Sequence, residues 1–479
     1  MLLVNTNRMK PPIAPVGLEY VASASAEAGR PADILDLCMV EDPGRSLREY
    51  FSRCSPRLVG LSMRNVDDCF WPSGRSFLGD LRDLVGKLRT LSDAKIVLGG
   101  VGFSIFARRI VEYVGADFGI RGDGERALPA LADALDGRGR LADVPGLVYR
   151  PARDAALVAN PPAWGEPLRV PARRDLLDNR AYFRLGGQIG LETKRGCPRS
   201  CAYCADPLAK GPRSRPRPPA EVADEAENLL AQGIDVLHLC DSEFNLPREH
   251  ALAVCRELIA RRLGEGLRWY VYLAVTPFDA ELADAMARAG CAGINFTGDA
   301  AAGEMLAAYA QPHRRGDLER AVRLCREHRI AVMVDLLLGG PGETEATLRE
   351  SIDVLKEIGP DCCGAALGLR VYPDTEIARR IAAMGPAETN PGIRRRYDGP
   401  VDLLQPTFYI APELGEQPAR LVRDLIAGDE RFFPPSDEDL AAGDHNYNDN
   451  STLVAAIEAG ARGAYWHILK SDPRCRGVS

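Results

Sequence analysis

Residues 194–205 read Lys194-Arg-Gly-Cys-Pro-Arg-Ser-Cys-Ala-Tyr-Cys-Ala205 and contain three cysteines in the spacing C-x3-C-x2-C. Three thiolates at this spacing can hold three irons of a cubane [4Fe-4S] cluster and leave the fourth iron open to chelate a small molecule. The same trio could bind zinc, but a zinc site needs a fourth ligand at a matching spacing. Because no second cysteine pair supplies that ligand, we predict a cluster held by Cys197, Cys201 and Cys204.

This motif resembles that of the radical S-adenosylmethionine (SAM) superfamily. In that family the open iron binds the amino and carboxylate groups of SAM, and the cluster donates an electron that breaks a C–S bond. The resemblance implies a [4Fe-4S] cluster and SAM as cofactors. It also implies that Tyr203, just before the last cysteine, contacts the bound cofactor.

Length and composition indicate a globular chain of two or three domains, since it has 479 residues, 46% of them hydrophobic and 27% charged. No apolar run reaches the ~18 residues of a membrane helix. The first residues lack the flanks of a signal peptide, so we expect a cytoplasmic protein. The 13 cysteines are then better interpreted as reduced thiols than as disulfides. A net charge of -7 argues against nucleic acid as a partner.

Residues 1–150 alternate short β-branched runs with amphipathic stretches, which predicts parallel βαβ units in a doubly wound, Rossmann-like sheet. The predicted strands are Leu2–Asn5, Asp33–Leu37, Leu58–Ser62, Lys95–Leu98 and Phe118–Arg121. Ligands bind such sheets at the carboxyl ends of the strands. The loops at those ends are Ser62-Met-Arg-Asn65, Gly99-Gly-Val-Gly102 and Gly122-Asp-Gly-Glu125.

These loops, upstream of the cysteine motif, resemble the cobalamin-binding domain of cobalamin-dependent radical SAM enzymes. The resemblance implies cobalamin contacts at Ser62, Asn65, Gly99, Gly100 and Gly122. The D-x-H-x-x-G motif that supplies a histidine to cobalt in other cobalamin proteins is absent. The six histidines, at 238, 250, 313, 328, 445 and 467, all lie outside this domain. An empty, vestigial scaffold therefore stays open as an alternative.

After a linker over 151–186, residues 187–388 repeat the alternation with longer helices and predict a partial (β/α)6 TIM barrel. The predicted strands are Gln188–Thr193, Asp235–Cys240, Trp269–Ala274, Gly293–Phe296, Val332–Leu338 and Ala365–Val371. Active sites on such barrels gather at the carboxyl ends of the strands. The cysteine loop follows the first strand, as the resemblance implies.

Other loops on the same face supply the remaining candidate residues. Asp241 and Glu243 follow the second strand, where acidic oxygens suit the SAM ammonium. Four further positions are expected to contact SAM: Asn295, Asp299, Gly339 and Gly340. Arg370 and Tyr372 follow the sixth strand and are expected to point into the cavity, where a guanidinium would suit a carboxylate substrate. The adjacent pair Cys362 and Cys363 is interpreted as packing, because neighbouring strand residues face opposite sides.

Residues 389–479 predict a small, α-rich C-terminal cap over the substrate. His445, in a polar loop between two helices, is our third candidate catalytic residue, with Tyr409 and Tyr447 as further candidate substrate contacts. The tail carries Cys475, which is faintly similar to the cysteine-rich tails of radical SAM proteins that make arsenic amino acids, although it lacks their several cysteines.

The resemblance implies a cobalamin-dependent methyltransferase acting on a small natural-product or amino-acid-like molecule. Such an enzyme uses two SAM molecules per turnover, one to methylate cobalamin and one to yield a 5′-deoxyadenosyl radical. An external electron donor such as flavodoxin or ferredoxin is implied, and neither nucleic acid nor membrane is expected as a partner. Two alternatives stay open: a radical SAM enzyme that transfers the 3-amino-3-carboxypropyl group or rearranges its substrate, and a non-catalytic cobalamin or iron–sulfur sensor.

Overall fold

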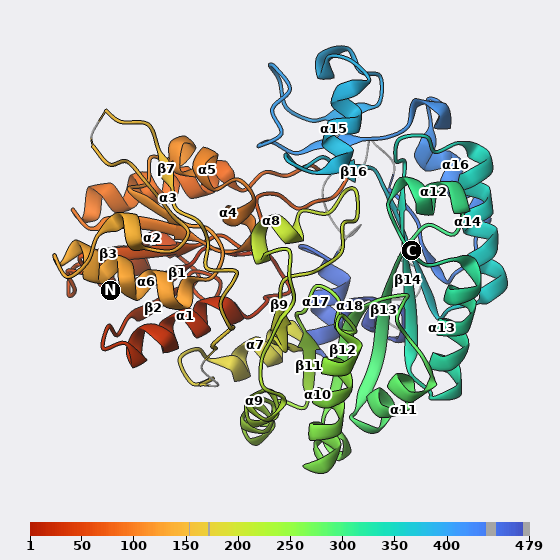
Figure 1. The fold of residues 1–479 in the computed structure, drawn as a ribbon, viewed down its shortest axis with the longest axis horizontal. Coiled ribbons are helices and arrows are strands. Elements are labelled where there is room, and N and C mark those ends of the chain that lie inside the picture. The colour runs from red at the N-terminus through yellow and green to blue at the C-terminus, as the bar shows by residue number, and fades with distance from the viewer. Residues whose placement is uncertain (153, 171–172, 437–446, 473–479) are drawn as a thin grey trace.

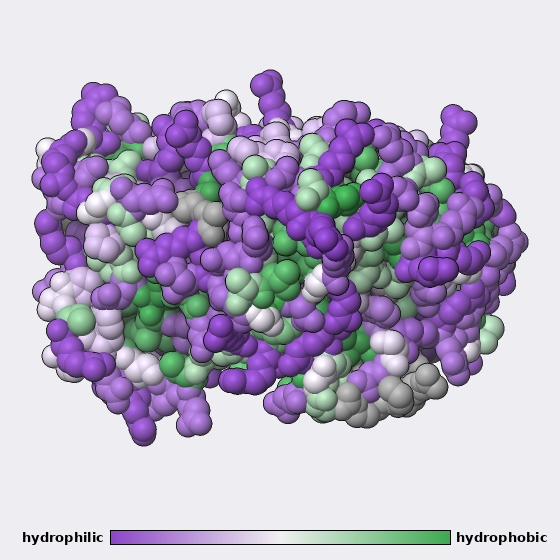
Figure 2. All heavy atoms as spheres, turned by 90° about the horizontal axis from the view of Figure 1, so that it is seen from below, coloured by the Kyte–Doolittle hydropathy of each residue, from purple (hydrophilic) through white to green (hydrophobic). Residues whose placement is uncertain are grey.

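The computed structural model describes residues 1–152, 154–170, 173–436 and 447–472. Figure 1 shows two α/β units side by side, with the N-terminal unit at the left and a half-open barrel at the right. Among the described residues, no helix is both long enough and apolar enough to cross a membrane. The face shown in Figure 2 is mostly hydrophilic, and hydrophobic residues show mainly in its hollows.

The N-terminal unit is built on a seven-stranded sheet in the order β2-β1-β3-β4-β5-β6-β7. The first five strands are parallel, and β6 and β7 extend the sheet antiparallel. The strands are β1 (Leu2–Asn5), β2 (Asp33–Asp36), β3 (Leu58–Ser62), β4 (Lys95–Gly99), β5 (Phe118–Ile120), β6 (Leu147–Tyr149) and β7 (Val158–Ala159). This doubly wound order places the topological switch point between β1 and β3, where ligands bind in such sheets.

Helices cover both faces of this sheet because each face is apolar. On one face α1 (Val16–Glu27) and α6 (Gly124–Leu135) contribute Leu18 and Leu128 to a buried cluster. On the other, Leu47, Leu81 and Ile110 pack in a second cluster. These residues come from α2 (Pro43–Phe51), α3 (Leu78–Leu91) and α5 (Ala107–Val114), and the short α4 (Val101–Ile105) follows β4.

The barrel sheet has seven parallel strands in the order β19-β15-β14-β13-β12-β11-β8. They are β8 (Ile189–Leu191), β11 (Val236–Leu239), β12 (Arg268–Ala274), β13 (Cys291–Asp299), β14 (Ala331–Leu338), β15 (Cys362–Leu367) and β19 (Phe432–Phe433). The covering helices are α9 (Pro219–Ala231), α10 (Arg248–Ala260), α11 (Ala280–Arg288), α12 (Gly303–Ala308), α13 (Arg315–Glu327), α14 (Glu345–Ile358) and α16 (Pro418–Ile426). The predicted α/β class and partial barrel are confirmed, with β19 as an additional edge strand.

The sixth barrel strand differs from its prediction. It begins at Cys362 and ends at Leu367, because Gly368 turns the chain with φ of 96°. Residues Leu369–Arg370 then form β16, which joins β17 (Ile393–Arg395) and β18 (Thr407–Tyr409) in an antiparallel sheet next to α15 (Glu376–Ala383). Cys362 and Cys363 pack in two different apolar clusters, as expected for adjacent strand residues.

The described C-terminal residues pack against strands of the barrel. The last two helices in the described part of the chain are α17 (Ser451–Glu458) and α18 (Tyr465–Ser471). Trp466 of α18 shares a buried cluster with Tyr270 and Met333 from inside the barrel. The described part of this segment therefore forms one wall of the space that the barrel strands leave open.

A buried polar network joins the two units. The Arg174 guanidinium lies 2.6 Å from the Glu19 carboxylate of α1 and 2.7 Å from the Glu225 carboxylate of α9, and none of the three side chains is exposed. Tyr20 donates to Glu225 at 2.6 Å, and Arg217 pairs with the same carboxylate at 2.7 Å. Buried charges are stable only when opposite charges and hydrogen bonds lie against them. The network therefore fixes α1 against α9 and holds the two sheets in one arrangement.

Candidate functional site

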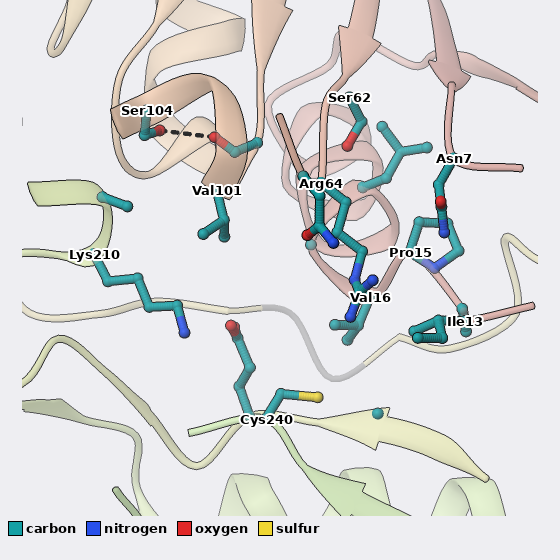
Figure 3. A pocket seen from close by; sticks show the side chains of 18 of the residues that line it. Asn7, Ile13, Pro15, Val16, Ser62, Arg64, Val101, Ser104, Lys210 and Cys240 are labelled. Carbon is teal, nitrogen blue, oxygen red and sulfur yellow. Dashed lines mark hydrogen bonds between the residues drawn. The ribbon is translucent and has the colours of Figure 1, made fainter. Parts of the chain in front are cut away.

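A cavity of about 680 Å³ runs from the carboxyl edge of the N-terminal sheet into the barrel. Its N-terminal wall comes from the loops after β1, β3, β4 and β5, the edge that includes the switch point between β1 and β3. Its other wall comes from β8, β11, β12 and β13 of the barrel. Figure 3 shows this arrangement, with Ser62, Arg64 and Val101 facing Lys210 and Cys240.

All five residues predicted to contact cobalamin line this cavity: Ser62, Asn65, Gly99, Gly100 and Gly122. A Cβ added at Gly99 would meet no atom within 4 Å, so its backbone faces open space, as a flat ligand requires. Gly100 serves packing instead, because its Cβ would lie 2.4 Å from the Met63 carbonyl oxygen. The residues present therefore fit a corrin ring against the sheet edge. Their individual roles stay predictions.

Ser104 at the start of this wall was missed by the sequence reasoning. Its hydroxyl donates to the Gly100 carbonyl at 2.8 Å and accepts from the Gly122 N–H at 3.0 Å. It therefore ties the loop after β4 to the loop after β5. Only the spacing of a serine four residues after Gly100 could have indicated it, because such a hydroxyl can bond back to the preceding turn.

The three motif cysteines lie in the loop between β9 (Lys194–Arg195) and α8 (Asp206–Lys210). Burial raises the pKa of the Cys201 thiol to about 12, and the Asp299 carboxylate acts in the same direction. Gln311 donates to the Cys201 sulfur at 3.3 Å. Within the described ranges, no three His, Cys, Asp or Glu side chains converge on one ion position. A cubane does not need such convergence, since each thiolate binds its own iron.

A carboxyl group and an ammonium group beside this loop each have a buried polar atom without a partner in the described part of the chain. One carboxyl oxygen of Glu243 accepts from the Thr297 hydroxyl at 2.8 Å, while its Oε2 has no hydrogen-bond partner among the described residues. The Lys194 ammonium, 2% exposed, has none among them either. Burial raises the pKa of Glu243 to about 8. Because buried polar groups are almost always bonded, these atoms fit a missing ligand that carries an ammonium and a carboxylate, as SAM does.

Asp241 and Asp299 are both already engaged within the protein. Asp241 lines the cavity, but its carboxylate accepts from the Thr193 N–H at 2.8 Å and from the Thr193 hydroxyl at 2.5 Å. Asp299 accepts from the Tyr203 hydroxyl at 2.6 Å and from Gln311, and burial raises its pKa to about 6. The Tyr203 hydroxyl thus links the cysteine loop to Asp299 at the end of β13. Contacts of either acid with SAM stay predictions.

The predicted glycine loop after β14 lies outside the cavity lining. Gly339 donates its N–H to Glu343 and has φ of 92°, which favours glycine. A Cβ at Gly340 would lie 2.3 Å from the Tyr309 hydroxyl oxygen. Both glycines are therefore required by close packing of the loop, whatever contact they also make with a cofactor.

The prediction that Arg370 and Tyr372 point into the cavity is wrong. The Arg370 guanidinium is buried against Asp67 of the N-terminal unit, with Nη2 and Oδ2 2.8 Å apart, and it donates to the Leu403 carbonyl. The Tyr372 hydroxyl oxygen lies 3.0 Å from the Cys69 sulfur. Neither residue lines the cavity. Their place at the junction of the two units makes them structural contacts. The third candidate, His445, lies outside the described residues.

The barrel end of the cavity is aromatic, which the sequence reasoning largely missed. Its wall includes His238, Tyr270, Tyr272, Tyr447, Tyr465 and Trp466. The His238 ring meets the Tyr272 ring edge to face at 5.5 Å between centroids. Burial lowers the pKa of His238 to about 4, so its imidazole is neutral at pH 7. Alternation along β11 and β12 indicates which of these side chains share a face.

The opposite end is polar and charged. Lys210 pairs with Asp206 at 3.2 Å, and Arg195 pairs with Glu125 at 2.7 Å across the two units. Ser242 donates to Asp206 at 2.6 Å. The cavity therefore offers hydrogen-bonding groups beside the sheet edge and an apolar aromatic pocket deeper in the barrel.

Comparison with known families gives two matches that follow the two units. The family described as "Radical SAM superfamily" matches residues 191–355. The family described as "B12 binding domain" matches residues 3–132. The tryptophan 2-C-methyltransferase of Streptomyces laurentii is 31% identical over 97% of this chain and 94% of its own length.

Solved structures agree with this assignment. The radical SAM methyltransferase TsrM from Kitasatospora setae, with tryptophan and a SAM analogue bound, is 34% identical. It superposes with a TM-score of 0.90 over 98% of this chain and 96% of its own. The same enzyme with cobalamin and a [4Fe-4S] cluster gives a TM-score of 0.89 at 32% identity, over 100% and 98% of the two chains. This chain therefore belongs to the cobalamin-dependent radical SAM methyltransferases, and it is an enzyme of that family.

Proposed function

We propose that this enzyme methylates an indole-bearing amino acid of the tryptophan type, with SAM as the methyl donor and cobalamin as the methyl carrier. The proposal rests on one observation: one continuous cavity joins the switch-point edge of the first sheet to an aromatic pocket inside the barrel. A corrin ring at the sheet edge and a planar substrate in the aromatic pocket would then lie next to each other.

Two further observations support this substrate class. The Streptomyces laurentii relative is named for methylation of tryptophan at carbon 2, and the Kitasatospora setae enzyme was solved with tryptophan bound. In this chain Tyr272 and Trp466 give the barrel end the flat apolar walls that suit an indole ring.

The chain's own residues would divide the work of holding three cofactors. Cys197, Cys201 and Cys204 would hold the cluster, and Glu243 with Lys194 would orient the ammonium and carboxylate of SAM. The loops at Ser62 and Gly99 would seat cobalamin. Once bound, these groups supply electron transfer and a methyl carrier, while the protein supplies position and excludes water.

A cluster that must be reduced needs an electron source. We therefore expect a small reducing protein such as flavodoxin or ferredoxin, as the resemblance of the cysteine motif implies. Cys201 and Cys204 are half-buried, so the cysteine loop is not fully enclosed by protein. This partial exposure would suit electron transfer from such a donor.

The test is anaerobic turnover with tryptophan and SAM labelled in its methyl group. The expected products are labelled methyltryptophan and S-adenosylhomocysteine in equal amounts. Methylthioadenosine would indicate aminocarboxypropyl transfer instead, and deoxyadenosine with unmethylated product would indicate rearrangement. The Cys201→Ala variant is the control, and labelled product from it would contradict the cluster assignment.

A further inference from the structure

A buried amide on the cavity wall lacks a partner for its oxygen. Asn295 of β13 is 2% exposed and lines the cavity. Its Oδ1 atom has no hydrogen-bond partner among the described residues. More than about 90% of buried polar groups in proteins have such a partner, so an orphaned acceptor in a ligand cavity points to a group that the ligand supplies.

The orientation of this amide is determined by its neighbour. The Asn295 Nδ2 donates to Oδ2 of Asp335 on β14 at 2.8 Å. An ionised carboxylate only accepts hydrogen bonds, so the amide nitrogen must face it and the amide oxygen must face away. Asp335 is itself tightly held, because a Cβ at Gly364 would lie 2.1 Å from its Oδ1. Asn295 therefore presents a fixed acceptor.

Aromatic rings adjoin this acceptor, whereas the Asp335 carboxylate is bonded to the nitrogen of the same amide. Tyr272 is the register partner of Asn295 on the neighbouring strand, and His238 lies beyond it on β11. One nitrogen of the His238 ring, Nδ1, also has no partner among the described residues. A planar heteroaromatic ring fits between such walls, with its edge toward the amide oxygen.

A neutral ring N–H suits this site better than an ammonium. An ammonium carries three donors, and a single amide oxygen would leave two of them unpaired in a buried site, which is costly. A ring N–H carries one donor and no charge, which matches one amide oxygen. An indole presents such a group at the edge of its plane.

We propose that Asn295, oriented by Asp335, accepts a hydrogen bond from the ring N–H of the substrate and so determines its specificity for N–H heteroaromatic rings. The inference rests on the proposed function, since it names the contact that selects the indole. Asp335 acts through Asn295 and is a positioning residue. A substrate whose ring lacks the N–H would leave the amide oxygen buried and unpaired, which lowers its affinity.

The experiment measures binding by the cofactor-loaded protein, using calorimetric titration with tryptophan and with its benzothiophene analogue, in which sulfur replaces the ring N–H. We expect wild-type protein to bind tryptophan about 10-fold or more tightly than the analogue. In Asn295→Leu this preference should fall to about 1, because neither ligand then meets an acceptor. In Asp335→Asn the amide is free to turn its nitrogen toward the cavity, so the preference should also fall. Met333→Leu, which changes the register neighbour of Asn295 on β14, should keep it.

The outcomes separate this inference from the proposed function. If wild-type protein neither binds nor methylates tryptophan, the proposed substrate class is wrong and this inference with it. If tryptophan is bound and methylated but the analogue binds equally well, or if Asn295→Leu keeps the preference, the contact is wrong while the proposed function stands. Circular dichroism and cobalamin content verify that each variant is folded. If Asn295→Leu fails that check, Asp335→Asn decides in the same way.

Discussion

The Asp335→Asn substitution should stabilise the protein increasingly as the pH rises. Burial raises the pKa of Asp335 to about 6, from its ordinary value of 3.8, and the hydrogen bond from Asn295 only partly offsets this. Its ionised form is therefore less favourable in the folded protein than in the unfolded chain. An uncharged amide of the same shape avoids that cost.

The sign and size follow from proton linkage. As the pH rises from 3.8 to about 6, the unfolded chain loses the proton while the folded protein keeps it, so folding stability falls over this range. One pKa unit corresponds to about 1.4 kcal/mol. The carboxylate should then cost about 1.5 kcal/mol at pH 5 and about 3 kcal/mol at pH 8.

The assay is anaerobic urea unfolding of wild-type protein and Asp335→Asn at pH 5, 6, 7 and 8. The difference in unfolding free energy between the two proteins isolates this group, because other titrating groups are shared. We expect the difference to grow by about 1.5 kcal/mol across the series in favour of the variant. A difference that is constant with pH, or that shrinks, would refute the argument that burial of an ionised Asp335 destabilises the fold.

Three further predictions concern the network between the units, the cluster and the sheet edge. Glu225→Gln should lower the unfolding free energy by about 3–5 kcal/mol, because it leaves the buried Arg174 with one anionic partner fewer; urea unfolding measures this. Cys201→Ala should abolish both the visible absorbance of the cluster and every SAM-derived product, measured by spectroscopy and chromatography. Gly99→Leu should lower the cobalamin content of the purified protein several-fold and leave its iron content unchanged, because the side chain would fill space that is open beside the sheet edge.

Each of these has a matched control. Arg261→Ala removes exposed ion pairs of α9 and α10 and should change stability by less than about 1 kcal/mol. Cys255→Ala changes a buried thiol away from the motif and should keep the cluster. Gly79→Ala adds a methyl group to a helix position with open space and should keep cobalamin. Equal losses in a variant and its control would contradict the assigned role.

Much of this fold could be predicted because its signals are local. All five strands predicted in the first unit lie within about one residue of those observed, and five of the six predicted in the barrel lie within about three, since alternation between strand and helix is encoded in short windows. The sixth barrel strand was predicted to begin at Ala365 and to run on to Val371, whereas β15 begins at Cys362 and Gly368 turns the chain after Leu367.

The candidate site was predictable only where one short segment contains it. The cysteine trio lies within eight residues, and the glycine at 99 follows its strand directly, so spacing alone located both. Arg370 was misassigned because its partner, Asp67, lies 303 residues away. Nothing in the sequence near Arg370 shows that a carboxylate from the other unit neutralises it.

The sequence by itself therefore determined the two α/β units, and it predicted the cluster ligands and the sheet edge expected to face a cofactor, because these depend on periodicity and on residues a few positions apart. Only the tertiary structure decided which polar atoms remain unpaired. Asn295 and Asp335 meet across two strands, and Trp466 reaches the same cavity from the last helix described. Such meetings depend on strand register and on the packing of distant segments, and these give the cavity its aromatic end and place the Asn295 amide in its wall.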